Sequence, residues 1–258
     1  ALWQRFRCAC DSVFERHKGV AAAANEERRR QLRAKEGLCA ALENAEGMSA
    51  AQAAETLRVA AREWSAIGPV PRAAENAIRT RYEAAVAALR SRMEAHRKAE
   101  MEAGHRALCA KLRLCQEIEA ALVGCDSVEA SLFERWNAAW QALPALATPI
   151  EQRMRKRFEA ALDAFRRHDR QYADNLRQGR DALLKELLRA EILLGMDSPA
   201  YLAQERLQLQ VEVLRSAFKS DRNAQAHDAQ LLRLCEIAAL VDGDAASRLE
   251  RVTRTVSV

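Results

Sequence analysis

The sequence has few residues that break helices and few that build a thick core. Of its 258 residues, nine are glycine, five are proline and 5% are aromatic, whereas apolar residues make up 49%. No apolar run approaches the roughly 18 to 20 residues of a membrane span, and no signal peptide is visible at its start. Abundant alanine with few helix breakers predicts thin helical packing, in which the few large side chains carry most of the burial.

Signatures of enzymes and metal sites are also lacking. No HExxH, GxSxG, phosphate-binding loop or dinucleotide fingerprint occurs, and the five histidines are solitary. The seven cysteines have no paired zinc spacing, and their odd number is typical of reduced thiols in a cytoplasm. We therefore expect a cytoplasmic protein without enzymatic activity, metal, cofactor, small-molecule substrate or membrane association.

The sequence does contain an internal repeat of about 76 residues. Trp64 recurs as Trp140, and an arginine followed by an aromatic residue occurs three times in the same register. Apolar residues around each aromatic recur at intervals of four, three and four, which places them on one helical stripe. The three stripes are Leu2, Phe6, Ala9 and Val13; Ile78, Tyr82, Ala85 and Leu89; and Met154, Phe158, Ala161 and Phe165. A helix with one apolar stripe is not stable alone, so stacking between successive units must bury it.

Breaks that contain proline separate the units. Pro69 and Pro71 remove two backbone donors and make a turn nearly obligatory, and Pro144 and Pro149 repeat the break. From Pro71 to Gly124 about fifty residues have helical composition, which predicts a rod of about 75 Å. The fold class is therefore all-α: elongated tandem repeats in which long helices alternate with short helices, in hairpins or three-helix bundles.

The helix-end signals predict finer boundaries. Gly47 suits a left-handed C-cap, and Ser49 with Gln52 a capping box. We expect further caps at Asp126 with Glu129 and at Gly195 with Asp197 or Ser198, a third long segment from Ile150 to Leu194, terminal helices over 201–218 and 225–241, and frayed residues 251–258. The period gives four segments: 1–47, the C-terminal half of a first repeat with a linking helix; 48–123, the second repeat; 124–195, the third repeat; and 196–258, terminal capping helices.

Several stretches resemble one bacterial repeat family, catalogued as domain of unknown function 349. They are WSAIGPVPR with IRTRYEAAVAAL, the N-terminal LWQRFRCACDSVFERHKG, and RAEILLGMDSPAYLAQERLQLQVEVL. The resemblance implies a cytoplasmic bacterial protein with several tandem helical copies, of which this chain is the C-terminal part. QALPALATP departs from the pattern in the later copy. The family brings no established activity.

Arginines at the repeated position are the candidate binding residues. Arg5, Arg81 and Arg157 have no acidic residue four positions away, so each could bind an anion such as an RNA phosphate, with Arg155 nearby. The alternative is a salt bridge to another helix, which we favour. We interpret the recurring aromatic residues and the first break as structural anchors: Trp64, Trp140, Phe6, Tyr82, Phe158, Pro69 and Pro71.

Two functions fit these patterns. The favoured one is a non-catalytic scaffold that presents helical surfaces to an unidentified protein partner. The other is an RNA- or ribosome-associated regulatory factor that uses basic helix faces, which the net charge of +5 permits without requiring.

Overall fold

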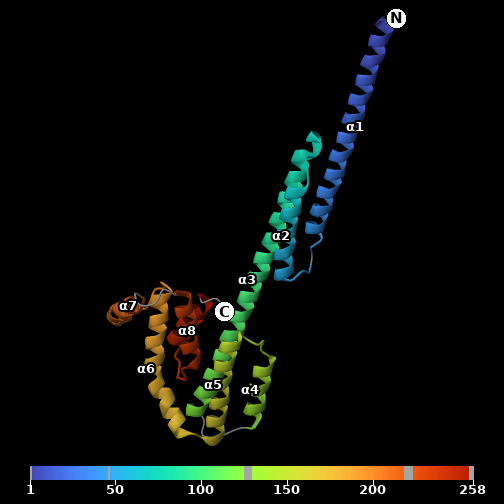
Figure 1. The fold of residues 1–258 in the computed structure, drawn as a ribbon. Coiled ribbons are helices and arrows are strands. Elements are labelled where there is room, and N and C mark those ends of the chain that lie inside the picture. Colours follow the sequence, from blue (N-terminus) through green and yellow to red (C-terminus); the bar gives the residue numbers. More distant parts are fainter. Residues whose placement is uncertain (1, 46, 125–129, 218–222, 256–258) are drawn as a thin grey trace. The chain divides into compact units, whose positions relative to one another are not determined.

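The computed structural model describes residues 2–45, 47–124, 130–217 and 223–255, and the regular elements in these ranges are all helices (Figure 1). The predicted all-α fold is confirmed. The chain forms two compact units, Ala1–Ala99 and Glu100–Val258. In the described ranges no helix is long and apolar enough to span a membrane.

The first unit contains α1 (Leu2–Glu43), α2 (Ala50–Ala66) and the first part of α3 (Arg72–Gly124). Between α1 and α2, Gly47 has a φ of 70°. The Ser49 hydroxyl accepts from the Gln52 amide at 3.3 Å, and the Gln52 side chain accepts from the Ser49 amide at 2.9 Å. The predicted C-cap glycine and capping box are confirmed.

The three helices of this unit are held by a small apolar core. Leu42 lies in the last turn of α1 and Ala45 just after it, Ala60 lies on α2, and Ala85 and Leu89 lie on α3. The break between α2 and α3 is fixed by Gly68, whose amide donates to the side-chain oxygen of Gln31 at 3.2 Å. The first half of α1 lies outside this core, and residues 3–9 and 11–20 are exposed.

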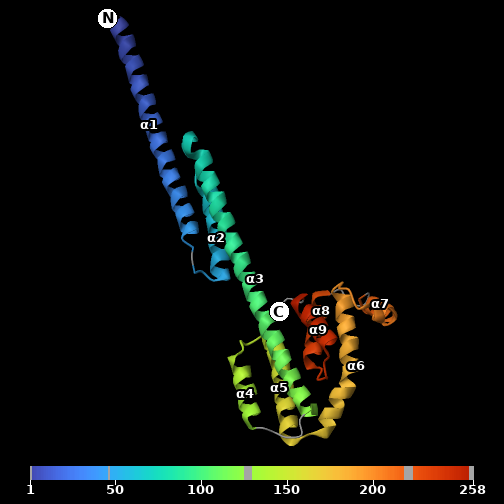
Figure 2. The same ribbon diagram turned by 180° about the vertical axis from the view of Figure 1, so that it is seen from behind.

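The second unit contains the rest of α3 and all later helices (Figure 2). These are α4 (Ala130–Ala142), α5 (Thr148–Arg167), α6 (Arg170–Leu193), η1 (Ala200–Leu202), α7 (Ala203–Ala217), α8 (Asn223–Glu236) and α9 (Gly243–Thr255). One large core unites α3, α4, α5, α6, α8 and α9. The α8 helix contacts both α5 and α6, and α6 also contacts α7 and α9.

The predicted third long segment, Ile150 to Leu194, is divided into two helices, α5 and α6. The α5 helix ends at Arg167 because His168 adopts a left-handed conformation, with a φ of 49°. Asp169 then caps α6, since its carboxylate accepts from the Tyr172 amide at 2.9 Å. No glycine or proline marks this break in the sequence.

The C-terminal expectations also need correction. Residues 251–255 are the last turn of α9, where Val252 and Thr253 are buried, so they are not frayed. The helix predicted to reach residue 241 ends at Glu236, and the Ser198 hydroxyl donates to Glu191 instead of capping the next helix. The predicted cap at Asp126 and Glu129 lies outside the described residues.

Candidate functional site

The best-defined constellation is a junction of ionic and aromatic contacts that occurs once in each unit. In the first unit, Arg81 donates from two guanidinium nitrogens to both oxygens of Glu43, at 2.8 and 2.7 Å. Trp64 stacks on Tyr82 with ring centroids 4.0 Å apart and planes inclined by 14°. Lys35 covers the indole, its Nζ lying 4.4 Å from the ring centroid. The junction therefore joins α1, α2 and α3.

The second unit repeats this junction with residues 76 positions later. Arg157 donates to both oxygens of Glu119 at 2.8 Å. Trp140 stacks on Phe158 with centroids 4.3 Å apart, and the Lys111 Nζ lies 4.6 Å from the Trp140 ring centroid. The same five roles are thus filled in the same register, which makes the junction a property of the repeat.

The two junctions differ in exposure to solvent. The side chains of Arg157 and Glu119 are 3% and 0% exposed, whereas those of Arg81 and Glu43 are 44% and 41% exposed. Burial lowers the pKa of Arg157, but its hydrogen bonds to Glu119 outweigh burial and raise the pKa overall. Hydrogen bonding to Arg81 lowers the pKa of Glu43. These shifts favour the charged forms of Arg157 and Glu43 at neutral pH, and the Arg157–Glu119 ion pair lies inside the core.

Glu151 adds a second ionic contact to the buried junction. Its carboxylate accepts from the Lys111 Nζ at 2.5 Å and from the Leu146 amide at 3.0 Å. Burial raises the pKa of Glu151, but these two bonds together lower it by more, so the net pKa shift is downward. Arg155, a predicted anion contact, is exposed and lies 3.5 Å from the same carboxylate.

The predicted anion contacts fall into two groups. At Arg81 and Arg157 the structure contains the alternative, an interhelical salt bridge, and the Glu119 carboxylate takes the place expected for a phosphate at Arg157. Arg5 is exposed on α1, and anion binding by Arg5 or Arg155 stays a prediction. The sequence signal for the acidic partners was their own period, since Glu43 and Glu119 are also 76 positions apart.

The predicted anchors also divide. Trp140 and Phe158 are buried, and Trp64 and Tyr82 are half-buried in their stacked pair. Phe6, by contrast, is 61% exposed and stacks on Trp3 of the same helix, so it is not a buried anchor and that prediction needs correction. Pro69 and Pro71 lie in the segment before the first residue of α3 and mark its start.

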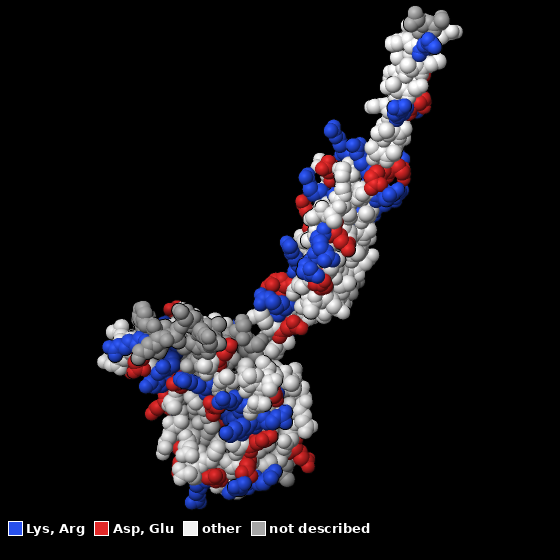
Figure 3. All heavy atoms as spheres, in the orientation of Figure 1, with Lys and Arg blue, Asp and Glu red and all other residues white. Residues whose placement is uncertain are grey.

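A run of arginines in the middle of α1 is diluted by acidic neighbours. On α1, Arg29 and Arg33 lie 4.0 and 3.1 Å from Glu26, and Arg30 lies 3.2 Å from Glu27. Figure 3 shows basic and acidic side chains interspersed on the visible face of each unit. The surface therefore presents a mixed charge pattern on that face.

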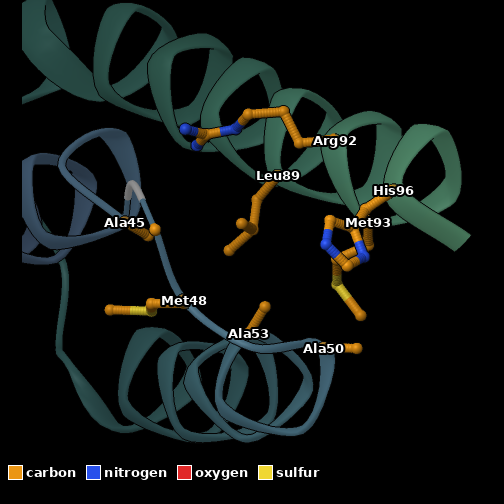
Figure 4. Close-up of a pocket in the computed structure, with 9 residues that line it drawn as sticks. Ala45, Met48, Ala50, Ala53, Leu89, Arg92, Met93 and His96 are labelled. Atoms are coloured by element: carbon orange, nitrogen blue, oxygen red, sulfur yellow. The ribbon is translucent and has the colours of Figure 1, made fainter. Parts of the chain in front are cut away.

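A recess of about 360 Å³ lies in the first unit, between α2, α3 and the loop that follows α1 (Figure 4). Leu89 projects into it from α3 towards Ala53, with Met48 on one side and His96 on the other. At the position equivalent to Leu89 the second unit has Phe165. The ring of Phe165 meets the ring of Trp136 edge-on, with the ring centroids 5.1 Å apart. Larger side chains thus fill the corresponding core in the second unit.

The buried thiols show no sign of nucleophilic activation. Cys109 lies 3.5 Å from the Thr253 hydroxyl and 3.6 Å from His105, yet burial raises the pKa of this thiol and lowers the pKa of His105. Neutral thiol and neutral imidazole are therefore favoured. Among the described residues no group of three or more histidine, cysteine or acidic side chains could hold a metal ion.

Thiol labelling provides a direct check of this environment. Burial raises the pKa of Cys115 and of Cys235 to about 12 from an ordinary value of 9.0, so both remain protonated at pH 8. Cys8, by contrast, is exposed. We expect maleimide to label Cys8 at pH 8 in the native protein and to label the two buried thiols only after denaturation, as read by peptide mass spectrometry. Rapid native labelling of Cys115 would contradict the described core.

The fold and its two equivalent junctions define an all-helical repeat protein. Residues 1–73 match the family model described as Domain of Unknown Function (DUF349). This segment is similar to that family, in agreement with the resemblance of the N-terminal stretch and of WSAIGPVPR noted in the sequence. No curated protein and no solved structure matches the chain.

Proposed function

We propose that this protein is a non-catalytic, cytoplasmic helical-repeat scaffold that binds a protein partner through the first half of α1. The proposal is supported by a stripe of exposed apolar residues, here named the α1 face: Phe6, Ala9 and Val13, with Arg5 beside them. Phe6 is 61% and Val13 65% exposed, and Trp3 stacks on Phe6 with centroids 6.1 Å apart. A row of large exposed apolar side chains is a mark of a binding surface.

The repeat gives this exposure its meaning. Tyr82 and Leu89 occupy the positions of Phe6 and Val13 in the next copy, where Leu89 is 2% exposed and Tyr82 is stacked. In the following copy Phe158 and Phe165 are 3% and 2% exposed. Two copies of the stripe are thus covered by other helices, which supports the α1 face as a surface that is covered when a partner binds.

A double substitution on the α1 face tests this function. Phe6→Asp with Val13→Asp is expected to abolish partner capture in a cross-linking pull-down while leaving the helical content and thermal stability unchanged, because both side chains are already exposed. Gln4→Asp is the matched control, since Gln4 is exposed and lies on the opposite side of the helix from the stripe. Equal capture by the double variant and the control would contradict the proposal.

An RNA-associated role is the competing outcome. The mixed charges on the surface and the ion pairs of Arg81 and Arg157 favour a protein partner. Binding of fluorescent RNA should be compared at about 50 and about 200 mM salt, because several phosphate contacts weaken affinity by orders of magnitude over that range. Tight binding that is lost at the higher salt would replace the scaffold proposal with the RNA-associated one.

A further inference from the structure

The two junctions join successive copies of the repeat head to tail. The segment that matches the family, 1–73, begins with the α1 face and ends just after Trp64 and the proline break. Its later part consists of the second half of α1 and α2, which together we call the acceptor hairpin. This hairpin presents Glu43 and Trp64. The stripe at the start of the next copy docks on this hairpin through Arg81 and Tyr82. Each copy therefore carries a docking stripe and an acceptor, which are different surfaces.

Both acceptors in the described part of the chain are occupied. The first receives α3, and the second, formed by the end of α3 with α4, receives α5 through Arg157 and Phe158. One further period after Glu119 and Trp140 the sequence has Gly195 and Ser216, so neither acceptor residue recurs. The helix α6 instead contacts α7, α8 and α9. A second copy of this chain would thus have to open one of its own junctions to cover an α1 face.

We propose that the α1 face binds a two-helix hairpin of a partner, built like the acceptor hairpin of this repeat. The inference rests on the proposed function and specifies its partner. The hairpin presents a glutamate to Arg5 and a tryptophan to Phe6, 21 positions apart along its sequence, as Glu43 and Trp64 are and as Glu119 and Trp140 are.

The chemistry of the two described junctions sets what this partner must supply. Its carboxylate accepts from the arginine through both oxygens, as in both junctions. Its indole is covered on one face by the aromatic ring and on the other by a lysine, which corresponds to Lys35 and Lys111. The partner hairpin also carries a small residue four positions before its glutamate. In the two described hairpins this position holds Cys39 and Cys115, which are each 0% exposed and leave no room for a larger side chain. A nucleic acid could neutralise Arg5 but would leave Ala9 and Val13 without an apolar cover.

A tandem duplication tests the geometry. Residues 1–76 are copied in frame before residue 1 of the full chain, so that the copied acceptor hairpin stands one period upstream of the original α1 face. Hydrogen exchange of the original segment 2–20 is expected to slow by about tenfold or more, because opening the new junction then requires undocking. Arg5→Glu in the original face should remove this protection, and Glu43→Arg in the copied hairpin should restore it, since the swap re-forms the ion pair.

Binding in trans provides the second measurement. A synthetic hairpin with the sequence of residues 24–71 is titrated against the full chain, with fluorescence anisotropy as the readout. We expect saturable binding that Arg5→Glu weakens by about tenfold or more and that Arg7→Glu leaves unchanged. Sedimentation of the chain alone separates self-association from binding to the hairpin, and a dimer that forms through the α1 face would overturn the inference.

The outcomes separate this inference from the proposed function. If the duplicated chain gains no protection and the synthetic hairpin does not bind, the inference fails. Loss of partner capture in the Phe6 and Val13 double variant would then still support the scaffold function, with a partner of different chemistry. If capture also survives that double variant, the scaffold function fails as well.

Discussion

Replacing Glu119 with glutamine is expected to lower the free energy of unfolding of the second unit by about 3 to 5 kcal/mol. The Arg157 guanidinium is buried and makes its two short bonds to this carboxylate, and it donates one longer bond to the Cys235 carbonyl, at 3.4 Å. A neutral amide removes the counter-charge and leaves a buried cation without compensation. Hydrogen exchange of the second part of α3 during urea titration reports the unfolding of this unit.

The first junction supplies the matched control for that result. Glu43→Gln removes the equivalent carboxylate from a pair that is nearly half exposed, so solvent screens the loss and the effect should be much smaller. A paired substitution, Glu119→Leu with Arg157→Met, should recover most of the stability lost by Glu119→Gln, because it removes both charges. Equal destabilisation by Glu43→Gln and Glu119→Gln would contradict the difference in burial.

Trp136→Ala is expected to cost about 3 to 5 kcal/mol in the unfolding of the second unit. Trp136 is 1% exposed, and its ring centroid lies 5.1 Å from that of Phe165 and 6.3 Å from that of Phe133. Its indole NH donates to the Glu117 carboxylate at 3.0 Å. The truncation leaves a cavity bounded by aromatic rings that cannot collapse into it, and it frees one acceptor. Urea unfolding followed by circular dichroism measures the change.

The corresponding position in the first unit makes this prediction specific. Ala60 stands where the second unit has Trp136, and it is already buried beside smaller neighbours. Trp64→Ala, at a half-buried ring, should therefore cost less than Trp136→Ala. A Trp136→Ala chain as stable as the parent would show that the aromatic cluster of Phe133, Trp136 and Phe165 does not hold the unit together.

Periodicity predicted the fold because the same helical signals recur in one register. The stripe around Tyr82, the capping box at Ser49 and the break before α3 all rest on local rules of helix formation. The break at His168 escaped prediction because a left-handed histidine gives no compositional signal. The terminal helix was missed for a related reason: Asp242 caps it, its carboxylate accepting from the Ala245 amide at 2.8 Å, and one acidic residue in a polar stretch is a weak sign.

The junction itself was only half predictable. The repeated arginines and aromatic residues were visible as a pattern, but their partners lie 38 positions away on other helices, and the choice of Glu43 over its neighbours depends on packing. The repeat could have identified Glu43 and Glu119 as partners, since these glutamates are 76 positions apart, as are Arg81 and Arg157. Burial could not be read in this way, because equivalent residues differ between the two units in what surrounds them.

Exposure of the α1 face is the observation from which the functional account follows. Two stripes are each covered by an acceptor hairpin, and in both cases a glutamate binds the arginine and a tryptophan stacks on the aromatic ring of the stripe. The third stripe, with Phe6 and Val13, is exposed. The α1 face thus resembles the two stripes that are covered, and the proposed partner is expected to resemble the hairpins that cover them.

The most direct test places a photo-crosslinking amino acid at position 6 of the full chain in cells, with position 4, on the opposite side of α1, as the control. The account predicts a cross-link at position 6 alone, to a helical protein segment that carries a tryptophan about 21 positions after a glutamate. Cross-links to RNA, or equal cross-linking at the two positions, would contradict the claim that the α1 face is a protein-binding surface.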